Sequence, residues 1–238
     1  MLFVHGFGLD ARMWQPQIEA LADKHRTIAV TLPGFGPNPT TSSDGVSAAR
    51  AILEVLDSLN VERAHVVGHA LGGAVAADFA LAFPHRVRTL VLVAALLRGR
   101  NSGIASWTPA ATLAREGNMT AAAKTWLADP LFASAMANPD LAPQLREFAS
   151  DYGGAHWRDE ITTTFESADP PGERLASITA PTLVVVGTED LPTFRAMADE
   201  YATTVPRARK VELSGAGHMA SLEASPAFNA ALRNFFDA

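Results

Sequence analysis

The sequence predicts an α/β fold, a doubly wound, mostly parallel β-sheet with a helical segment inserted between two of its strands. Short apolar runs alternate with stretches of helical spacing along much of the 238 residues. One run, at 64–68, leads into a glycine-flanked corner and then into a helix. Residues 97–177 break this rhythm, because they contain several helical patterns and no good strand. These three observations favour one large domain with an insertion.

The first half of the chain alternates strands with helices. Residues 2–4 are predicted to form a buried strand whose carboxyl end opens into the glycine-rich loop 5–8. An antiparallel hairpin precedes this strand in many folds of this type, and we expect none here. The remaining patterns predict strands at 27–31 and 64–68, helices at about 11–24 and 47–59, and a turn-rich loop at 32–39.

The second half supplies the rest of the sheet. A helix rich in small apolar residues is expected from 70 to 83, where Pro84 stops it. The remaining patterns predict strands at 87–94, 182–186 and 208–213, and helices at 119–127, 141–150 and about 226–236.

Residues 97–177 are predicted to form a helical cap, or lid, on a core made of residues 1–96 and 178–238. The sequence Pro170-Pro171-Gly172 marks an expected hinge back to the core. Ligands of parallel sheets bind outside the carboxyl ends of the strands, so a cap at this place would cover the site.

Composition places the chain among globular proteins and argues against several partners. Apolar residues make up 48% of it, and 19 basic against 25 acidic residues give a net charge of −6, which disfavours nucleic acid and anionic membranes. It has no cysteine, which excludes a thiol nucleophile and a disulfide framework. We see no basic leader and no apolar run near the ~20 residues that span a bilayer. A cytoplasmic protein is therefore expected, either a monomer or a homodimer.

The corner at 68–72 has the shape of a nucleophile elbow, Gly-x-Ser-x-Gly, but Ala70 occupies the serine position. The elbow forces its central residue into a strained backbone conformation, which costs a non-glycine residue about 1–2 kcal/mol. A nucleophile justifies that strain, since the turn lifts its oxygen into a cleft. The sequence keeps the scaffold for a serine and omits the serine.

The other groups needed for acyl transfer occur in the expected chain order. His218 follows the last strand in a loop with two glycines, which allow its imidazole to reach back over the elbow. Asp190 is expected to orient it, in preference to Glu189, because a short turn after Gly187 returns the third residue to the strand end. The backbone N–H groups of Phe7 and Leu71 are the expected oxyanion donors.

Four motifs together resemble the α/β-hydrolase superfamily: His-Gly-Phe-Gly at 5–8, the elbow at 68–72, Gly-x-x-Asp at 187–190 and Gly-x-Gly-His at 215–218. The resemblance spans nearly the whole chain and is weakest in the expected lid. It is closest to small bacterial carboxylesterases and enol-lactonases, which also have a helical lid and an Asp-Leu-Pro like the one at 190–192. It implies an α/β-hydrolase fold and hydrolysis through an acyl-enzyme, with no cofactor.

Three hypotheses account for Ala70. In the first, the natural residue is serine and Ala70 is an engineered change that traps the substrate. In the second, alanine is native and His218 with Asp190 activates water or does lyase-type acid/base chemistry. The string Gly-His-Ala-Leu-Gly is similar to one in a pyrimidine-catabolism hydrolase of this superfamily. In the third, the protein is a non-catalytic receptor for a ligand.

The substrate is expected to be a small-to-medium, mainly apolar ester or lactone, because the expected lid is rich in Trp, Phe and Met and has no cluster of basic residues. We expect no metal site, since His65 and His69 lie on a strand and a turn and share no helical face. The side chains expected in the substrate pocket are His69, Trp107, Trp126, Phe132, His156, Trp157 and Met219.

Overall fold

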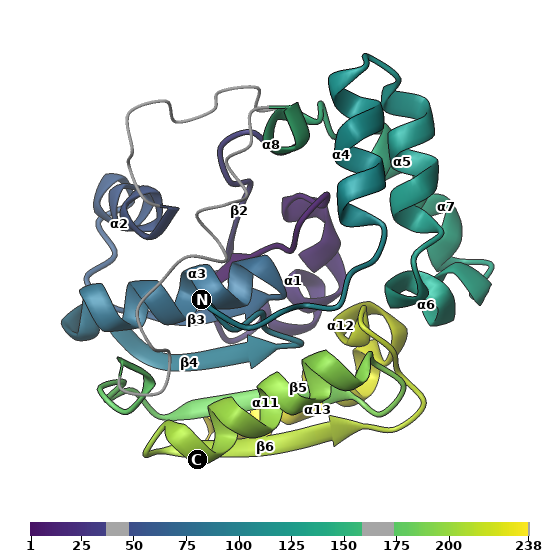
Figure 1. Ribbon diagram of the computed structural model, residues 1–238. Helices are drawn as coiled ribbons and strands as arrows, with labels where there is room; N and C mark the ends of the chain where they lie inside the picture. Colours follow the sequence, from purple (N-terminus) through teal and green to yellow (C-terminus); the bar gives the residue numbers. More distant parts are fainter. Residues whose placement is uncertain (37–47, 159–173, 238) are drawn as a thin grey trace.

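The computed structural model describes residues 1–36, 48–158 and 174–237 of the chain. Its strands form one sheet in the order β2-β1-β3-β4-β5-β6, and every neighbouring pair is parallel (Figure 1). The predicted parallel α/β sheet is therefore confirmed. The strands are β1 (Leu2–Val4), β2 (Ile28–Val30), β3 (Ala64–His69), β4 (Val87–Val93), β5 (Thr182–Gly187) and β6 (Ala208–Leu213).

The central strands are buried on both faces. Phe3 of β1, Val91 of β4 and Val185 of β5 have no exposed surface. Strands that are apolar on both sides form where helices cover both faces of a parallel sheet. The edge strand β6 differs, because its Arg209 and Lys210 side chains are exposed to solvent. Charged residues on an edge strand oppose pairing with another sheet.

Helices lie on both faces of this sheet. In Figure 1, α3 (Leu71–Ala82) and α11 (Pro192–Thr204) lie in front of the sheet, while α1 (Gln15–Leu21) and α13 (Ser225–Phe236) lie behind it. The helix α2 (Ala48–Ser58) packs on α3, which explains why α3 is apolar on nearly all sides. Within the described ranges, we find no helix that combines the length and the apolar character needed to cross a bilayer.

Several helices differ from the prediction, and two of them cover the sheet. The helix expected over 11–24 begins as a tight 3-10 turn, η1 (Ala11–Trp14), because the Asp10 carboxylate accepts the N–H of Arg12 at 2.9 Å. The helix α11 is absent from the prediction, although its apolar side chains recur at helical spacing and could have indicated it. The buried residues on that face of α11 are Phe194, Met197, Ala198 and Tyr201.

Between β4 and β5 the described part of the chain is helical, and its helices stand beside the carboxyl ends of the strands (Figure 1). The patterns expected at 119–127 and 141–150 correspond to α5 and α7. The hinge expected at 170–172 lies outside the described residues, as do 37–39 of the expected loop. The helices are α4 (Trp107–Arg115), α5 (Met119–Leu127), η3 (Pro130–Phe132), α6 (Ala133–Ala137), α7 (Leu141–Asp151) and α8 (Ala155–Arg158).

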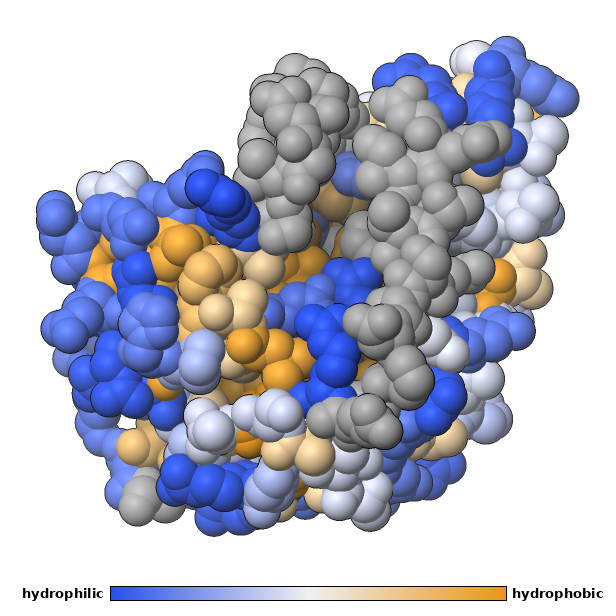
Figure 2. Space-filling model, turned by 60° about the vertical axis from the view of Figure 1, so that its left-hand side comes forward, coloured by the Kyte–Doolittle hydropathy of each residue, from blue (hydrophilic) through white to orange (hydrophobic). Residues whose placement is uncertain are grey.

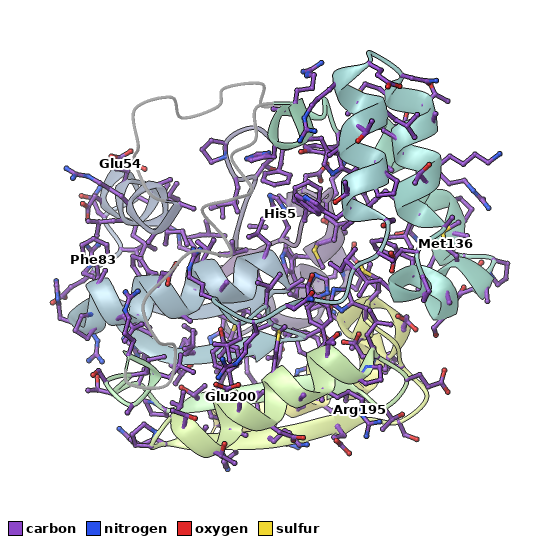
Figure 3. All side chains as sticks on the ribbon, in the orientation of Figure 1. His5, Glu54, Phe83, Met136, Arg195 and Glu200 are labelled. Atoms are coloured by element: carbon purple, nitrogen blue, oxygen red, sulfur yellow. The ribbon has the colours of Figure 1, made fainter. Side chains whose placement is uncertain are left out.

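The surface follows the usual division between polar and apolar residues. On the face shown in Figure 2, hydrophilic residues cover the outer parts and hydrophobic residues gather towards the middle. Figure 3 shows Glu54 and Arg195 at the outside of the molecule, whereas His5 lies in its interior.

His5 is a buried histidine with two structural hydrogen bonds. Its Nδ1–H donates to the carbonyl of Gly6 at 2.7 Å, and its Nε2 accepts the N–H of Leu32 at 2.9 Å. Burial lowers the pKa of His5 to about 4. Because Nε2 already accepts a hydrogen bond, a proton there would break the contact with Leu32 as well as charge a buried ring.

We expect Gly72→Ala to destabilise the protein. A Cβ at Gly72 would lie 2.3 Å from the carbonyl oxygen of His5 and 2.4 Å from that of Val4, and backbone cannot move aside easily. The free energy of unfolding in urea should fall by about 1–3 kcal/mol. Gly153→Ala is the control, because a Cβ there meets no atom within 4 Å. Equal unfolding midpoints for the two variants would contradict this account of α3 packing.

Stability should depend on pH through His5. The unfolded histidine has a pKa of 6.5 and the folded one about 4, so between these values the unfolded chain binds the extra proton. The contribution is complete above pH 6.5 and is lost as the pH falls towards 4. In His5→Gln, the slope of unfolding free energy against pH should drop by up to ~1.4 kcal/mol per unit. Urea titrations from pH 7 to 4.5 test this, with the exposed His85→Gln as control. An unchanged slope in His5→Gln would refute it.

Candidate active site

The site lies where the strand order reverses. From β1 the chain proceeds to β2 on one side, and from β3 it proceeds to β4 on the other. The loops that follow β1 and β3 therefore meet at the carboxyl edge, which is where open parallel sheets bind ligands. These loops carry residues 5–8 and Ala70.

Ala70 keeps the strained backbone of an elbow, with φ 49° and ψ −113°. Its N–H donates to the carbonyl of Val93 at 2.9 Å, and its own carbonyl accepts the N–H of Leu96 at 3.0 Å. Both partners belong to the end of β4 or the loop after it. A conformation of this kind costs about 1–3 kcal/mol and persists only where the surroundings impose it.

His218 and Asp190 form a buried pair. His218 Nδ1 lies 3.1 Å from each carboxylate oxygen of Asp190, and the two side chains are only 3% and 0% exposed. Since a carboxylate only accepts, Nδ1 carries the hydrogen, and Nε2 is the nitrogen that can take up a proton. The N–H of Leu191 also donates to Asp190, at 2.7 Å. Glu189, the alternative acid, is exposed.

His69 lies beside this pair, with its ring centroid 5.0 Å from that of His218. Its Nε2–H donates to the backbone carbonyl of His218 at 3.0 Å. Burial, followed by the neighbouring His218, lowers the pKa of His69 to about 3. His69 is therefore neutral at physiological pH and adds no positive charge next to His218.

The two expected oxyanion donors are on neighbouring elements. Leu71 is the first residue of α3, so its N–H has no partner inside the helix and lies at the positive end of the helix dipole. Phe7 lies in the loop after β1. Within the described ranges, neither N–H is engaged by another group of the chain.

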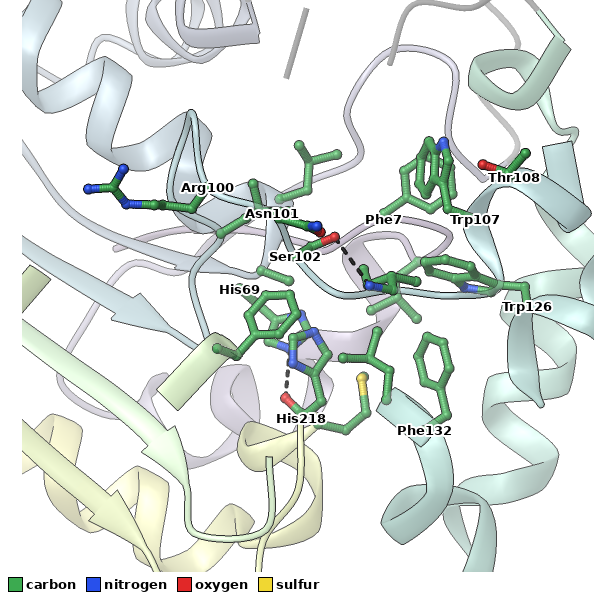
Figure 4. A pocket seen from close by; sticks show the side chains of 18 residues that line it. Phe7, His69, Arg100, Asn101, Ser102, Trp107, Thr108, Trp126, Phe132 and His218 are labelled. Carbon is green, nitrogen blue, oxygen red and sulfur yellow. Dashed lines mark hydrogen bonds between the residues drawn. The ribbon is translucent and has the colours of Figure 1, made fainter. Parts of the chain in front are cut away.

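A cavity of about 300 Å³ brings these groups together (Figure 4). Most of the residues expected at the site line it, including both Ala70 and His218. The expected residues that line it are Phe7, His69, Ala70, Leu71, Trp107, Trp126, Phe132, His218 and Met219.

Sequence reasoning missed half of the cavity wall. Several of the missed residues belong to the loop that follows β4, and a position just after a parallel strand could have indicated them. Phe194 of α11 was also missed, and its ring centroid lies 4.4 Å from that of His218. The missed residues are Leu9, Leu96, Arg100, Asn101, Ser102, Ile104, Thr108, Leu131 and Phe194.

His156 and Trp157 do not line this cavity, contrary to expectation. Both pack among other aromatic side chains. His156 stacks on Phe35, with ring centroids 4.2 Å apart, and Trp157 is only 1% exposed. The rings of both contact that of Phe7, which does line the cavity. In the part of the chain that the structure describes, no group of three or more His, Asp and Glu side chains could hold a metal ion.

Comparison with known proteins agrees with this geometry. The putative carbamate hydrolase RutD of Variovorax paradoxus (strain S110) is 30% identical over 243 residues, covering 99% of this chain and 90% of that protein. The dihydrolipoyllysine-residue acetyltransferase component of the acetoin cleaving system of Cupriavidus necator is 32% identical over 239 residues. That match covers 98% of this chain, which spans only 62% of the relative's length.

The structural comparison includes the enol-lactonase from Burkholderia xenovorans LB400. It superimposes with a TM-score of 0.83 at 26% identity, covering 100% of this chain and 90% of that one. A family model described as the Alpha/beta hydrolase family matches residues 1–231, a range that includes Ala70, Asp190 and His218. This chain therefore belongs to the alpha/beta hydrolase family.

Proposed function

We propose that this site hydrolyses a small-to-medium, mainly apolar carboxylic ester or lactone by the serine-hydrolase mechanism. His218 is the base, Asp190 orients it, and the N–H groups of Phe7 and Leu71 form the oxyanion hole. The observation that carries the proposal is the buried His218–Asp190 pair, whose histidine lines the same cavity as the elbow residue Ala70.

The mechanism needs an oxygen at residue 70, and alanine has none. We propose that the site is built for serine there and that Ala70 is an engineered replacement. A serine hydroxyl would attack the substrate carbonyl and pass its proton to Nε2 of His218, which would return it to the leaving group. In other serine hydrolases, removal of the nucleophile lowers kcat about 10⁶-fold, while the substrate still binds. The chain with Ala70 would then bind its substrate without cleaving it.

The cavity wall supports an apolar substrate. Trp107, Trp126 and Phe132 supply much of the wall, and 300 Å³ suits a small ligand. Arg100 also lines the cavity, but its guanidinium pairs with Glu200 at 2.7 Å and so is already neutralised. A lactone fits this chemistry, and the enol-lactonase of Burkholderia xenovorans LB400 shares the fold at 26% identity.

The proposal includes a lid, formed by the helical segment between β4 and β5. We propose residues 97–177 as the lid and residues 1–96 with 178–238 as the core. The three aromatic residues Trp107, Trp126 and Phe132 reach the cavity from this segment, so it contributes wall to the site as a lid would.

A second candidate is a native serine-less hydrolase, in which His218 draws a proton from water and the water attacks the carbonyl. The observation in its favour is the 30% identity over 99% of this chain to a putative carbamate hydrolase, RutD of Variovorax paradoxus (strain S110). The substrate would then include carbamates as well as esters.

Ala70→Ser should create a reactive serine. We expect burst-phase hydrolysis of activated aryl esters and covalent labelling of residue 70 by a fluorophosphonate, located by mass spectrometry. Adding His218→Ala should reduce the rate by about 10³-fold or more, because the serine then has no base. Ala70→Gly, which also lacks the oxygen, is the matched control. The proposal would be wrong if a folded Ala70→Ser protein were not labelled by the fluorophosphonate and hydrolysed no ester or lactone.

Measurements on the chain with Ala70 distinguish the two alternative functions, activation of water and a ligand receptor. Turnover of a carbamate or ester that His218→Ala abolishes would favour activation of water. A ligand that raises Tm without turnover in either protein would favour a receptor.

A further inference from the structure

The loop that carries His218 is held by a carboxylate outside the proposed triad. Glu223 lies at the end of the short helix α12 (Ala220–Glu223). Its Oε2 accepts the N–H of Gly217 at 2.9 Å, and its Oε1 accepts the N–H of Met219 at 2.9 Å. One carboxylate therefore binds the backbone on both sides of His218.

A third donor reaches the same carboxylate from the helical segment. The hydroxyl of Ser134, on α6, donates to Oε2 of Glu223. Gly217 leaves room for this arrangement, since a Cβ there would lie 2.9 Å from the Cβ of Ser134 and 3.3 Å from each Glu223 oxygen. The side chains of Ser134 and Glu223 thus leave little room for a Cβ at residue 217.

A further backbone group of this stretch is held by another side chain. The carbonyl of His218 accepts Nε2–H of His69 at 3.0 Å. Consecutive residues 217–219 therefore have an N–H, a carbonyl and an N–H held by two side chains. The position of the His218 side chain in the cavity depends on the backbone of these three residues.

We propose that Glu223 is a positioning residue for His218. The inference rests on the proposed role of His218 as the base. Hydrogen bonds from backbone N–H groups to an ionised carboxylate are among the stronger ones in proteins, so Glu223 restrains the loop firmly. A misplacement of about 1 Å at a reacting group can cost about 10²-fold in rate. Glutamine cannot replace Glu223, because one of its two terminal atoms would be an NH₂ that faces an N–H.

Kinetics in the Ala70→Ser chain test the proposal. Glu223→Gln should lower kcat about 10- to 100-fold with KM changed less than about twofold, because the base moves while the pocket wall stays. Gly217→Ala should act in the same direction by pushing Ser134 and Glu223 apart. Ser134→Ala is the matched control, since both amide bonds to Glu223 remain, and its kcat should stay within about threefold. An unchanged kcat in Glu223→Gln, or an effect on KM alone, overturns the proposal.

A second measurement needs no turnover and uses the chain with Ala70. The hydrogen on Nδ1 of His218 should give a downfield proton NMR signal, which its loss in Asp190→Asn would assign. We expect Glu223→Gln to shift or broaden this signal and Ser134→Ala to leave it in place. Asp129→Asn controls for lost stability, because Asp129 also accepts two backbone N–H groups, from Ser106 at 2.8 Å and Leu131 at 3.0 Å.

The two measurements separate the inference from the proposed function. If Ala70→Ser shows no activity, the proposed function fails, and the NMR signal alone decides whether Glu223 positions His218. A signal that stays unchanged in a folded Glu223→Gln protein, or that moves equally in Asp129→Asn, overturns the role of Glu223.

Discussion

The close approach of α3 to β1 is the constraint on which the rest of the site depends. Gly72 lies so near the carbonyls of Val4 and His5 that a Cβ would be 2.4 Å or less from either oxygen. This contact places the N-terminus of α3 beside the loop after β1, so the N–H groups of Leu71 and Phe7 come from adjacent elements. Hydrogen bonds to Val93 at the end of β4 and to Leu96 in the loop after it hold Ala70 at a φ of 49°. The strained turn persists although alanine has no oxygen that the turn could place in the cavity.

Two histidines in the site differ in their electrostatic surroundings. His218 lies against the Asp190 carboxylate, which stabilises a positive imidazolium. Among the residues that the structure describes, His69 has no carboxylate partner, and burial lowers its pKa to about 3, so it stays neutral while donating to the His218 carbonyl. A second cation at His69 would oppose proton uptake by His218. The site thus holds one histidine paired with a carboxylate and another that serves as a neutral hydrogen-bond donor.

Phe7 joins the core to the helical segment. Its ring contacts those of Trp107 and Trp126 at the cavity and those of Tyr152 and Trp157 behind it. Aromatic pairs of this kind add about 0.5–1.5 kcal/mol each beyond burial. The residue expected to supply an oxyanion donor through its backbone therefore also anchors the surrounding wall through its side chain. Composition alone could not divide these aromatics into wall and core, because the division depends on how they pack in the folded chain.

The sequence by itself determined the parallel sheet, most helices and the elbow, because apolar period and glycine spacing act over a few residues. The short turn that returns Asp190 to the end of β5 is local in the same sense. Only the tertiary structure decided that Phe194 packs on His218, that His156 stays outside the cavity and that Ser134 reaches Glu223. Contacts between distant segments are responsible: His69 and His218 are 149 residues apart, and Ser134 and Glu223 are 89 apart. No local pattern specifies such pairs, since they form only when the sheet brings its loops to one edge.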